Sequence, residues 1–262
     1  MHIGCKNTII PNSVESIGES AFFGCSGLTS IVIPSNVKYI GYYAFYACSN
    51  LTTISVEAGN TAYNSADGCN AIIETASNKL IAGCKNTIIP NSVESIDDWA
   101  FFGCAGLTSV VIPNSVKSIG SGAFFGCSDL TSVTIGDGVE SIGNFAFVNC
   151  KGLKTIVSEI KKPFEIGIVV DTVIYATATL TVPKDTKSLY QSTAGWDKFQ
   201  NIVEAEGTGV DAVMHTANED SEIIIYTLSG QQASRTTRRY MDAAWQQLPN
   251  GVYIVNGKKR MK

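Results

Sequence analysis

Charged side chains are scarce in this chain, and the shortage limits the classes of function it can have. They make up 16% of the 262 residues, against roughly 25% in an average soluble domain. The net charge is −4, so the basic footprint of a nucleic-acid-binding protein is missing. No apolar run approaches the ~20 residues of a membrane-spanning helix, and no membrane span is expected. The abundance of Gly, Ser, Thr and Asn favours β structure with many turns over a helical bundle.

Catalytic and metal-binding motifs are also missing from the sequence. The two histidines, His2 and His215, have no Ser or Cys partner in a recognisable motif, and no phosphate-cradling loop occurs. No C-x-x-C pair occurs either, so no zinc site is expected. Two carboxylate groups are interpreted as solvated turn positions and not as a Ca²⁺ site: Glu94 with Asp97–Asp98, and Asp137 with Glu140. The sequence therefore predicts a protein that is not an enzyme and has no cofactor.

The cysteines reveal an internal repeat. Intervals of 23 residues separate Cys25 from Cys48, and the same interval separates Cys104, Cys127 and Cys150. A fixed period of this length is typical of a solenoid, in which each repeat is one structural unit stacked on the next.

One unit, LTSIVIPSNVKYIGYYAFYACSN from Leu28, indicates how each turn is built. Ile31 and Ile33 fall on the same side of an extended segment because strand side chains alternate. Pro34 ends the strand because it has no N–H to donate. A second apolar set around Phe45 returns the chain to the core. A single unit cannot bury both of its apolar edges, so the units are expected to stack and to add one parallel strand per turn.

This pattern resembles the leucine-rich repeat, and most closely the BspA-like repeats of bacterial surface proteins. The resemblance runs from about Cys5 to Gly152 and includes a paired Ala-Phe in five copies: Ala21–Phe22, Ala44–Phe45, Ala100–Phe101, Ala123–Phe124 and Ala146–Phe147. It implies a leucine-rich repeat solenoid, a right-handed β/α-type superhelix of 23-residue units. It also implies a secreted or surface-displayed protein that binds host matrix proteins or other cells.

An island at about residues 56–83 interrupts the regular repeat. The turn that contains it is ten residues longer than the others, and two apolar runs flank Thr75–Asn78, which predicts a β-hairpin. A decorative hairpin and a local recognition element both remain open. Met1–Cys5 aligns with Leu80–Cys84, so the chain is expected to open partway through another such island. The missing signal segment therefore says little about the compartment.

The C-terminal part of the chain is expected to end the solenoid and to add a small module. Residues 158–206 predict a cap with one or two short helices and with Trp196 in its core, so the solenoid domain spans residues 1–206. Residues 207–262 predict a linker followed by a small all-β module. This module resembles the secretion-type β modules that follow other secreted proteins.

The repeated cysteines are expected to be unpaired. Stacked turns place equivalent Cα atoms about 4.8 Å apart, a distance that by itself permits a disulfide. Equivalent side chains point the same way, however, which leaves the Cβ atoms about as far apart, against a preferred ~3.8 Å. We therefore expect a ladder of buried thiols at Cys25, Cys48, Cys104, Cys127 and Cys150. Cys69, in the island, is the thiol to test for reactivity.

Two surfaces are candidates for binding a partner. Outward-facing strand positions are predicted to line the concave face of the solenoid: Ser30, Val32, Thr53, Ser55, Ser109, Val111, Ser132 and Thr134. These residues are small and neutral, unlike the Trp, Tyr and Arg of binding hot spots. Tyr42 and Tyr43 fill variable positions and predict an exposed contact patch, whereas Tyr46 is expected in the core.

Two functions follow from these patterns. The first is a recognition or adhesion module, secreted or at the cell surface, that binds an extracellular protein or glycan. The second is a structural spacer without a ligand of its own, which the small and neutral strand face favours. The oligomeric state and the partner's identity stay open.

Overall fold

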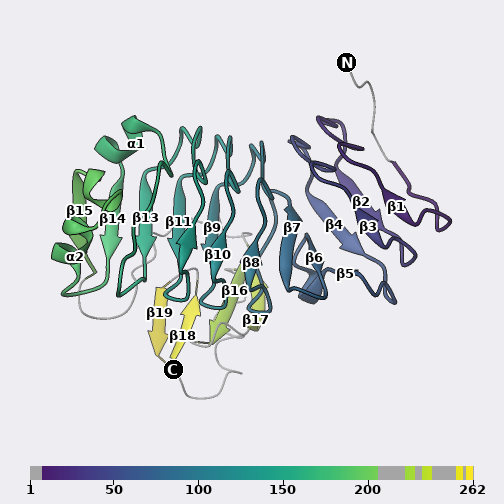
Figure 1. The fold of residues 1–262 in the computed structure, drawn as a ribbon. Helices are drawn as coiled ribbons and strands as arrows, with labels where there is room; N and C mark the ends of the chain where they lie inside the picture. Colours follow the sequence, from purple (N-terminus) through teal and green to yellow (C-terminus); the bar gives the residue numbers. More distant parts are fainter. Residues whose placement is uncertain (1–7, 206–221, 228–231, 238–251, 256–257, 262) are drawn as a thin grey trace.

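The repeats form a solenoid whose turns lie side by side along the molecule (Figure 1). The computed structural model describes residues 8–205, 222–227, 232–237, 252–255 and 258–261. Its longer repeat strands are β2 (Ser30–Ile33), β4 (Thr53–Val56), β9 (Ser109–Ile112), β11 (Ser132–Ile135) and β13 (Thr155–Ser158). Neighbouring strands are parallel, and their partners lie 23 residues apart, as Ser109 and Ser132 do. The expected leucine-rich repeat solenoid, with one parallel strand per turn, is confirmed.

Side chains on these strands alternate between the core and an outer face. In β2, Ile31 and Ile33 are buried whereas Ser30 and Val32 are exposed, as the period-two pattern predicts. The outer face is divided between two sheets. One holds β2 and β4, and the other joins β9, β11 and β13 to β14 (Thr179–Val182) and β15 (Asn201–Glu204). The described repeats therefore present two strand platforms instead of one continuous face.

A second row of short strands returns each turn to the start of the next. These strands are β1 (Ser16–Ile17), β3 (Tyr39–Ile40), β8 (Ser95–Ile96), β10 (Ser118–Ile119) and β12 (Ser141–Ile142). They also pair in parallel, β1 with β3 and β10 with both β8 and β12. The α-helices of the described chain, α1 (Thr172–Thr177) and α2 (Lys187–Ser192), lie beyond the regular repeats. Short strands and tight turns, with few helices, therefore form the returning side of the regular repeats.

Stacked side chains hold successive turns together in the core. The phenylalanines of the Ala-Phe pairs stack on one another. Their ring centroids are 4.7 Å apart for Phe101 and Phe124 and 5.1 Å apart for Phe124 and Phe147. Beside this stack the Cys127 and Cys150 thiols donate to the carbonyl oxygens of Phe101 and Phe124, at 3.3 and 3.1 Å. Each thiol thereby adds a second hydrogen bond to a carbonyl oxygen that already accepts a backbone N–H.

The cysteine prediction is confirmed for most of the ladder and wrong for one member. The ladder cysteines that are free and buried are Cys48, Cys104, Cys127 and Cys150. Cys25, in contrast, is disulfide-bonded. The argument from stacked side chains applies only between equivalent positions of neighbouring turns, so it does not exclude a partner elsewhere.

The island enters the core and separates two stretches of solenoid. It contains β5 (Tyr63–Asn64), a 3₁₀ turn η1 (Ala66–Gly68), β6 (Ala71–Glu74) and β7 (Lys79–Gly83). The expected hairpin is β6 with β7, which are antiparallel, and β7 then pairs in parallel with β8. Ile72 packs in the hydrophobic cluster of the N-terminal turns, whereas Ile73 packs in the cluster of the C-terminal turns. The hairpin is therefore not decorative, because it closes two cores at once.

Polar side chains also anchor the island to the N-terminal turns. The Asn60 amide donates to the carbonyl oxygens of Pro34 and Val37, at 2.8 and 3.0 Å. Its side-chain oxygen accepts from the backbone N–H of Tyr63 at 2.8 Å. The Tyr63 hydroxyl in turn accepts from the backbone N–H of Ile40 at 2.9 Å. β5 is thereby fixed beside β3.

The C-terminal end of the solenoid is closed by large buried side chains. Trp196 and Tyr190 are fully buried, with ring centroids 5.1 Å apart, and the Trp196 indole donates to the carbonyl of Phe164 at 2.9 Å. Trp196 lies in a short 3₁₀ turn, η2 (Trp196–Lys198), after α2. The expected core position of Trp196 is confirmed, as are short helices in this segment.

A small antiparallel sheet forms near the C-terminus. Its order is β17–β16–β18–β19, with β16 (Glu222–Thr227), β17 (Gln232–Thr237), β18 (Val252–Val255) and β19 (Lys258–Met261). The expected linker is Glu204–Asn218, and its residues from 206 onward lie outside the described residues, as do His2 and His215. The division into domains at 1–206 and 207–262 stays a prediction. Among the described helices, none has the length and apolar character needed to cross a membrane.

Candidate functional site

A cleft lies at the seam where the island hairpin separates two repeat turns. The N-terminal side is the turn 41–46 and the C-terminal side is the turn 97–102. The cleft has a volume of about 390 Å³ and is lined by both turns and by residues of the island. This volume falls at the lower end of the roughly 300–1,000 Å³ of ligand pockets. We call this space the seam cleft.

At the seam cleft an aspartate, Asp97, replaces a glycine of the repeat. A Cβ at Gly41 or Gly120 would lie 2.5 Å from a backbone nitrogen of the preceding turn, so these positions require glycine. Asp97 has the equivalent place in its own turn, where its N–H donates to the carbonyl of Leu80 in β7 at 2.9 Å. A hairpin strand, not a repeat turn, therefore precedes Asp97, and its side chain has room to line the cleft.

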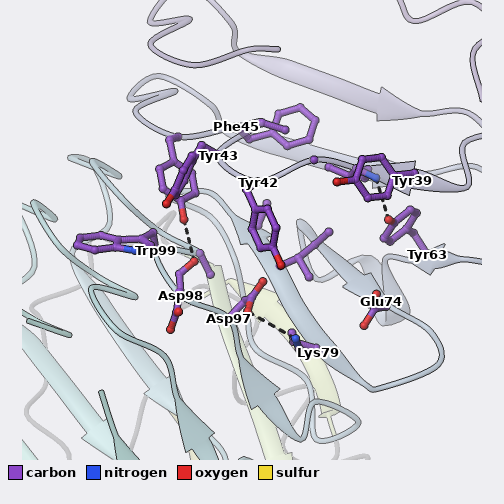
Figure 2. Close-up of a pocket in the computed structure, with 17 residues that line it drawn as sticks. Tyr39, Tyr42, Tyr43, Phe45, Tyr63, Glu74, Lys79, Asp97, Asp98 and Trp99 are labelled. Atoms are coloured by element: carbon purple, nitrogen blue, oxygen red, sulfur yellow. Dashed lines mark hydrogen bonds and ion pairs between the residues drawn. The ribbon is translucent and has the colours of Figure 1, made fainter. Parts of the chain in front are cut away.

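Tyrosines form one wall of the seam cleft. Tyr42 is 72% exposed and Tyr43 is 41% exposed, with ring centroids 6.3 Å apart. Tyr43 also packs edge-on against Tyr46 at 4.6 Å. Figure 2 shows Tyr42 extending from its turn toward Asp97 on the opposite side. The predicted exposure of Tyr42 and Tyr43 thus agrees with the structure, and their role in binding stays a prediction.

Tyr46 joins the two sides of the seam. Its ring stacks on Phe102 with centroids 5.5 Å apart, and its hydroxyl donates to the backbone carbonyl of Asp98 at 2.9 Å. The ring is part-buried, so the expectation that Tyr46 is a core residue is wrong. Burial is the main cause that raises the pKa of Tyr46, and Tyr43 adds to it. The hydroxyl therefore stays protonated and remains a donor.

Carboxylates form the opposite wall. The Lys79 ammonium lies 3.6 Å from one Asp97 carboxylate oxygen, and both side chains are partly exposed. Asp98 accepts from the backbone N–H of Ser121 at 2.6 Å. Burial raises the pKa of Asp97, Lys79 counteracts this shift, and neighbouring Asp98 adds to it. The interpretation of Asp97 as a solvated turn position is therefore wrong, because its side chain is half-buried in the cleft.

The other predicted contact residues lie on the long strands. They face outward on two separate sheets, with Val32 48% exposed in β2 and Val111 63% exposed in β9. The remaining members of the set are Ser30, Thr53, Ser55, Ser109, Ser132 and Thr134. None of these residues lines the seam cleft. Their contact with a partner stays a prediction.

Sequence reasoning missed the residues that the island contributes to the cleft. Glu74, at the end of β6, and Lys79, at the start of β7, line it together with Asp97. In the sequence, Glu74 ends the first of the two apolar runs that flank Thr75–Asn78, and nothing in the repeat period connects it to Tyr42. One sequence feature could have predicted the cleft: Asp97 stands where other repeats have glycine. It indicates that no repeat turn packs against this position from the N-terminal side.

The described residues outside the cleft offer neither a reactive thiol nor a group of metal ligands. Cys69 is buried, so it is a poor candidate for reaction with solutes. Burial raises the pKa of Cys48 to about 11 and that of Cys104 to about 12. Across the described residues, no group of three or more His, Cys, Asp or Glu is arranged to hold a metal ion. Asp137 instead forms an ion pair with Lys161 at 2.7 Å.

Comparison with known proteins identifies the repeat. The family profile described as "BspA type Leucine rich repeat region (6 copies)" matches residues 2–73 and 72–167, which is more than half of the chain. No curated protein matches the chain.

Two solved leucine-rich repeat proteins are similar to the chain. A leucine-rich repeat protein from Eubacterium ventriosum is 24% identical, with a TM-score of 0.57, and the match covers 70% of this chain and 49% of that protein. A leucine-rich cell surface protein from Faecalibacterium prausnitzii is 28% identical, with a TM-score of 0.45, over 75% of this chain and 53% of that protein. The chain thus spans about half the length of these solved proteins.

Proposed function

Because the chain belongs to the BspA-type leucine-rich repeat family, we propose that it is a non-enzymatic recognition or adhesion module, secreted or displayed at a bacterial surface. The family supports a role in protein interaction or as a scaffold. In this proposal the chain binds a protein or glycan of a host or of a neighbouring cell.

The seam cleft carries the proposal. Tyrosine is among the residues that dominate binding hot spots because it offers a large rigid area with a polar end. Tyr42 leaves 72% of its surface exposed beside a hollow of about 390 Å³. Exposed Val32 and Val111 on the strand faces offer smaller side chains with no polar end. The cleft is therefore the better contact site.

A binding screen with matched variants tests the proposal. The full chain is titrated against immobilised extracellular-matrix proteins and glycans. The double variant Tyr42→Ser/Tyr43→Gly gives this turn the residues of the equivalent turn, Ser121 and Gly122, so it should fold. Tyr43 has a φ of 62°, which glycine adopts without strain. We expect the variant to lose binding at least about tenfold, as for loss of a hot-spot aromatic, with an unchanged melting temperature.

Phe145→Gly is the matched control. Phe145 holds the same repeat position as Tyr43, is 43% exposed and also has a positive φ, 64°, but it does not line the cleft. Its substitution should leave binding unchanged. Equal losses in both variants would refute the cleft as the site. Binding abolished only by Val111→Lys would move the site to the strand face.

The spacer function is the second candidate. The outer strand positions of β2, β4, β9 and β11 are Ser, Thr and Val, which are not hot-spot residues. A screen without any saturable partner would favour the spacer.

A further inference from the structure

We propose that the seam cleft receives an arginine side chain presented by a protein partner. This inference rests on the proposed recognition function and names the chemical group that the site would recognise. It follows from three properties of the cleft: an open tyrosine wall, an excess of carboxylates and a small volume.

The tyrosine wall offers an aromatic face to a cation. Tyr42 is the most exposed of the lining tyrosines at 72%, and its ring centroid lies 6.3 Å from that of Tyr43. Tyr43 is held in place by its edge-on contact with Tyr46. A guanidinium stacks on such faces through both planarity and cation–π attraction. The wall is thus partly preorganised, and Tyr42 remains open to a ligand.

The opposite wall carries an excess of negative charge. The ionisable acidic and basic side chains of the described lining are Glu74, Asp97, Asp98 and Lys79. Lys79 pairs with Asp97 at 3.6 Å, so the carboxylates of Glu74 and Asp98 have no lining cation to balance them. Asp98 accepts a backbone N–H through one oxygen, and a carboxylate has further lone pairs to offer. A cationic ligand would complement this wall.

The composition of the lining favours a guanidinium over a sugar. A sugar hydroxyl both donates and accepts, and sites for such groups commonly contain amide side chains. The described lining contains no Asn, Gln or Arg, whereas its carboxylates act only as acceptors when ionised. Arginine carries five N–H donors in a planar fork that matches carboxylates.

Three short peptides test the inference on the full chain. The probes are acetyl-Gly-Arg-Gly-amide, its citrulline counterpart, which is similar in shape but uncharged, and its lysine counterpart. Ligand-observed NMR titration at low salt measures their affinities. We expect saturable binding of the arginine peptide, and about tenfold weaker binding of the citrulline peptide because a charge-assisted contact is lost. The lysine peptide should bind more weakly than arginine because it cannot bond in a fork.

Protein variants locate the binding. Tyr42→Ser should weaken the binding of the arginine peptide about 2- to 5-fold, as expected for loss of a cation–π contact. Asp98→Asn should weaken it about tenfold, as for loss of a charged hydrogen bond. Asp129→Asn is the control, because Asp129 is an exposed turn carboxylate outside the cleft, and it should bind like the unmodified chain.

The outcomes separate this inference from the proposed function. Equal binding of arginine and citrulline peptides, or equal losses in Asp98→Asn and Asp129→Asn, would overturn it. In another outcome, the arginine peptide shows no binding while the screen finds a macromolecular partner whose binding depends on Tyr42 and Tyr43. That result would refute the arginine site and leave the recognition function standing. A glycan partner that depends on Tyr42 and Tyr43 would likewise refute the arginine site and leave the recognition function standing. Failure of both assays would refute both proposals.

Discussion

Replacement of Ile72 by alanine tests whether the island holds the two stretches of solenoid together. Ile72 is completely buried in β6 and belongs to the cluster of the N-terminal turns. Its neighbour Ile73 is equally inaccessible but belongs to the C-terminal cluster. If the hairpin is a structural element of both cores, each residue should be as costly to truncate as a residue of the repeats themselves.

The expected cost follows from the burial. Alanine removes every side-chain carbon beyond Cβ, which amounts to roughly 2.5 kcal/mol at about 0.8 kcal/mol per carbon. The cavity left behind adds to this, because a core between two stacked layers cannot fully collapse, and measured losses are about 2–5 kcal/mol. We therefore expect Ile72→Ala to lower the free energy of unfolding by about 3 kcal/mol.

Chemical denaturation and hydrogen exchange measure the effect. In a solenoid each repeat contacts only its neighbours, so Ile72→Ala should reduce amide protection chiefly in β2 and β4, and Ile73→Ala chiefly in β8 to β11. Ile88→Ala is the control, since Ile88 is 42% exposed, and it should cost less than about 0.5 kcal/mol. A loss below about 1 kcal/mol in Ile72→Ala would show that the hairpin is decorative after all.

Three further predictions concern the turns and the thiols. Gly120→Ala should destabilise by about 1–3 kcal/mol in a denaturation assay, because its Cβ would lie 2.5 Å from the Asp98 nitrogen; a neutral result would contradict the glycine argument. The raised pKa of Asp97, caused first by burial, means that the folded chain holds this proton more tightly than the unfolded chain. The stability of the unmodified chain relative to Asp97→Asn should therefore fall as pH rises through the folded pKa, and a gap that is constant from pH 4 to 7 would refute this. Cys48, buried and with a pKa of about 11, should label with iodoacetamide at pH 7.5 only after unfolding, and rapid labelling of the native chain would refute its burial.

Local sequence was sufficient to predict the repeat fold. Ile31 and Ile33 with Pro34 define a strand and its end, and Phe45 with Cys48 defines the return to the core. These features repeat every 23 residues, and the register of the strands follows the same interval. Because each turn packs mainly on the next, a one-dimensional period contains most of the three-dimensional arrangement.

The sequence predicted one wall of the candidate site and not the other. Tyr42 and Tyr43 departed from the composition of the other repeats, which identified one wall. Asp97 and Lys79 were brought opposite them only by the packing of the hairpin, which lies between turns that the period would have placed in contact.

The sequence by itself therefore determined the solenoid, its strands and its exposed tyrosines, since these depend on side-chain alternation and on neighbouring turns. Only the tertiary structure decided that the island closes two cores and leaves a cleft at their seam. The physical reason is that an insertion has no period: its place depends on which buried surfaces its own side chains cover. Ile72 and Ile73 are adjacent in the chain, but Ile72 packs in the N-terminal core and Ile73 in the C-terminal core.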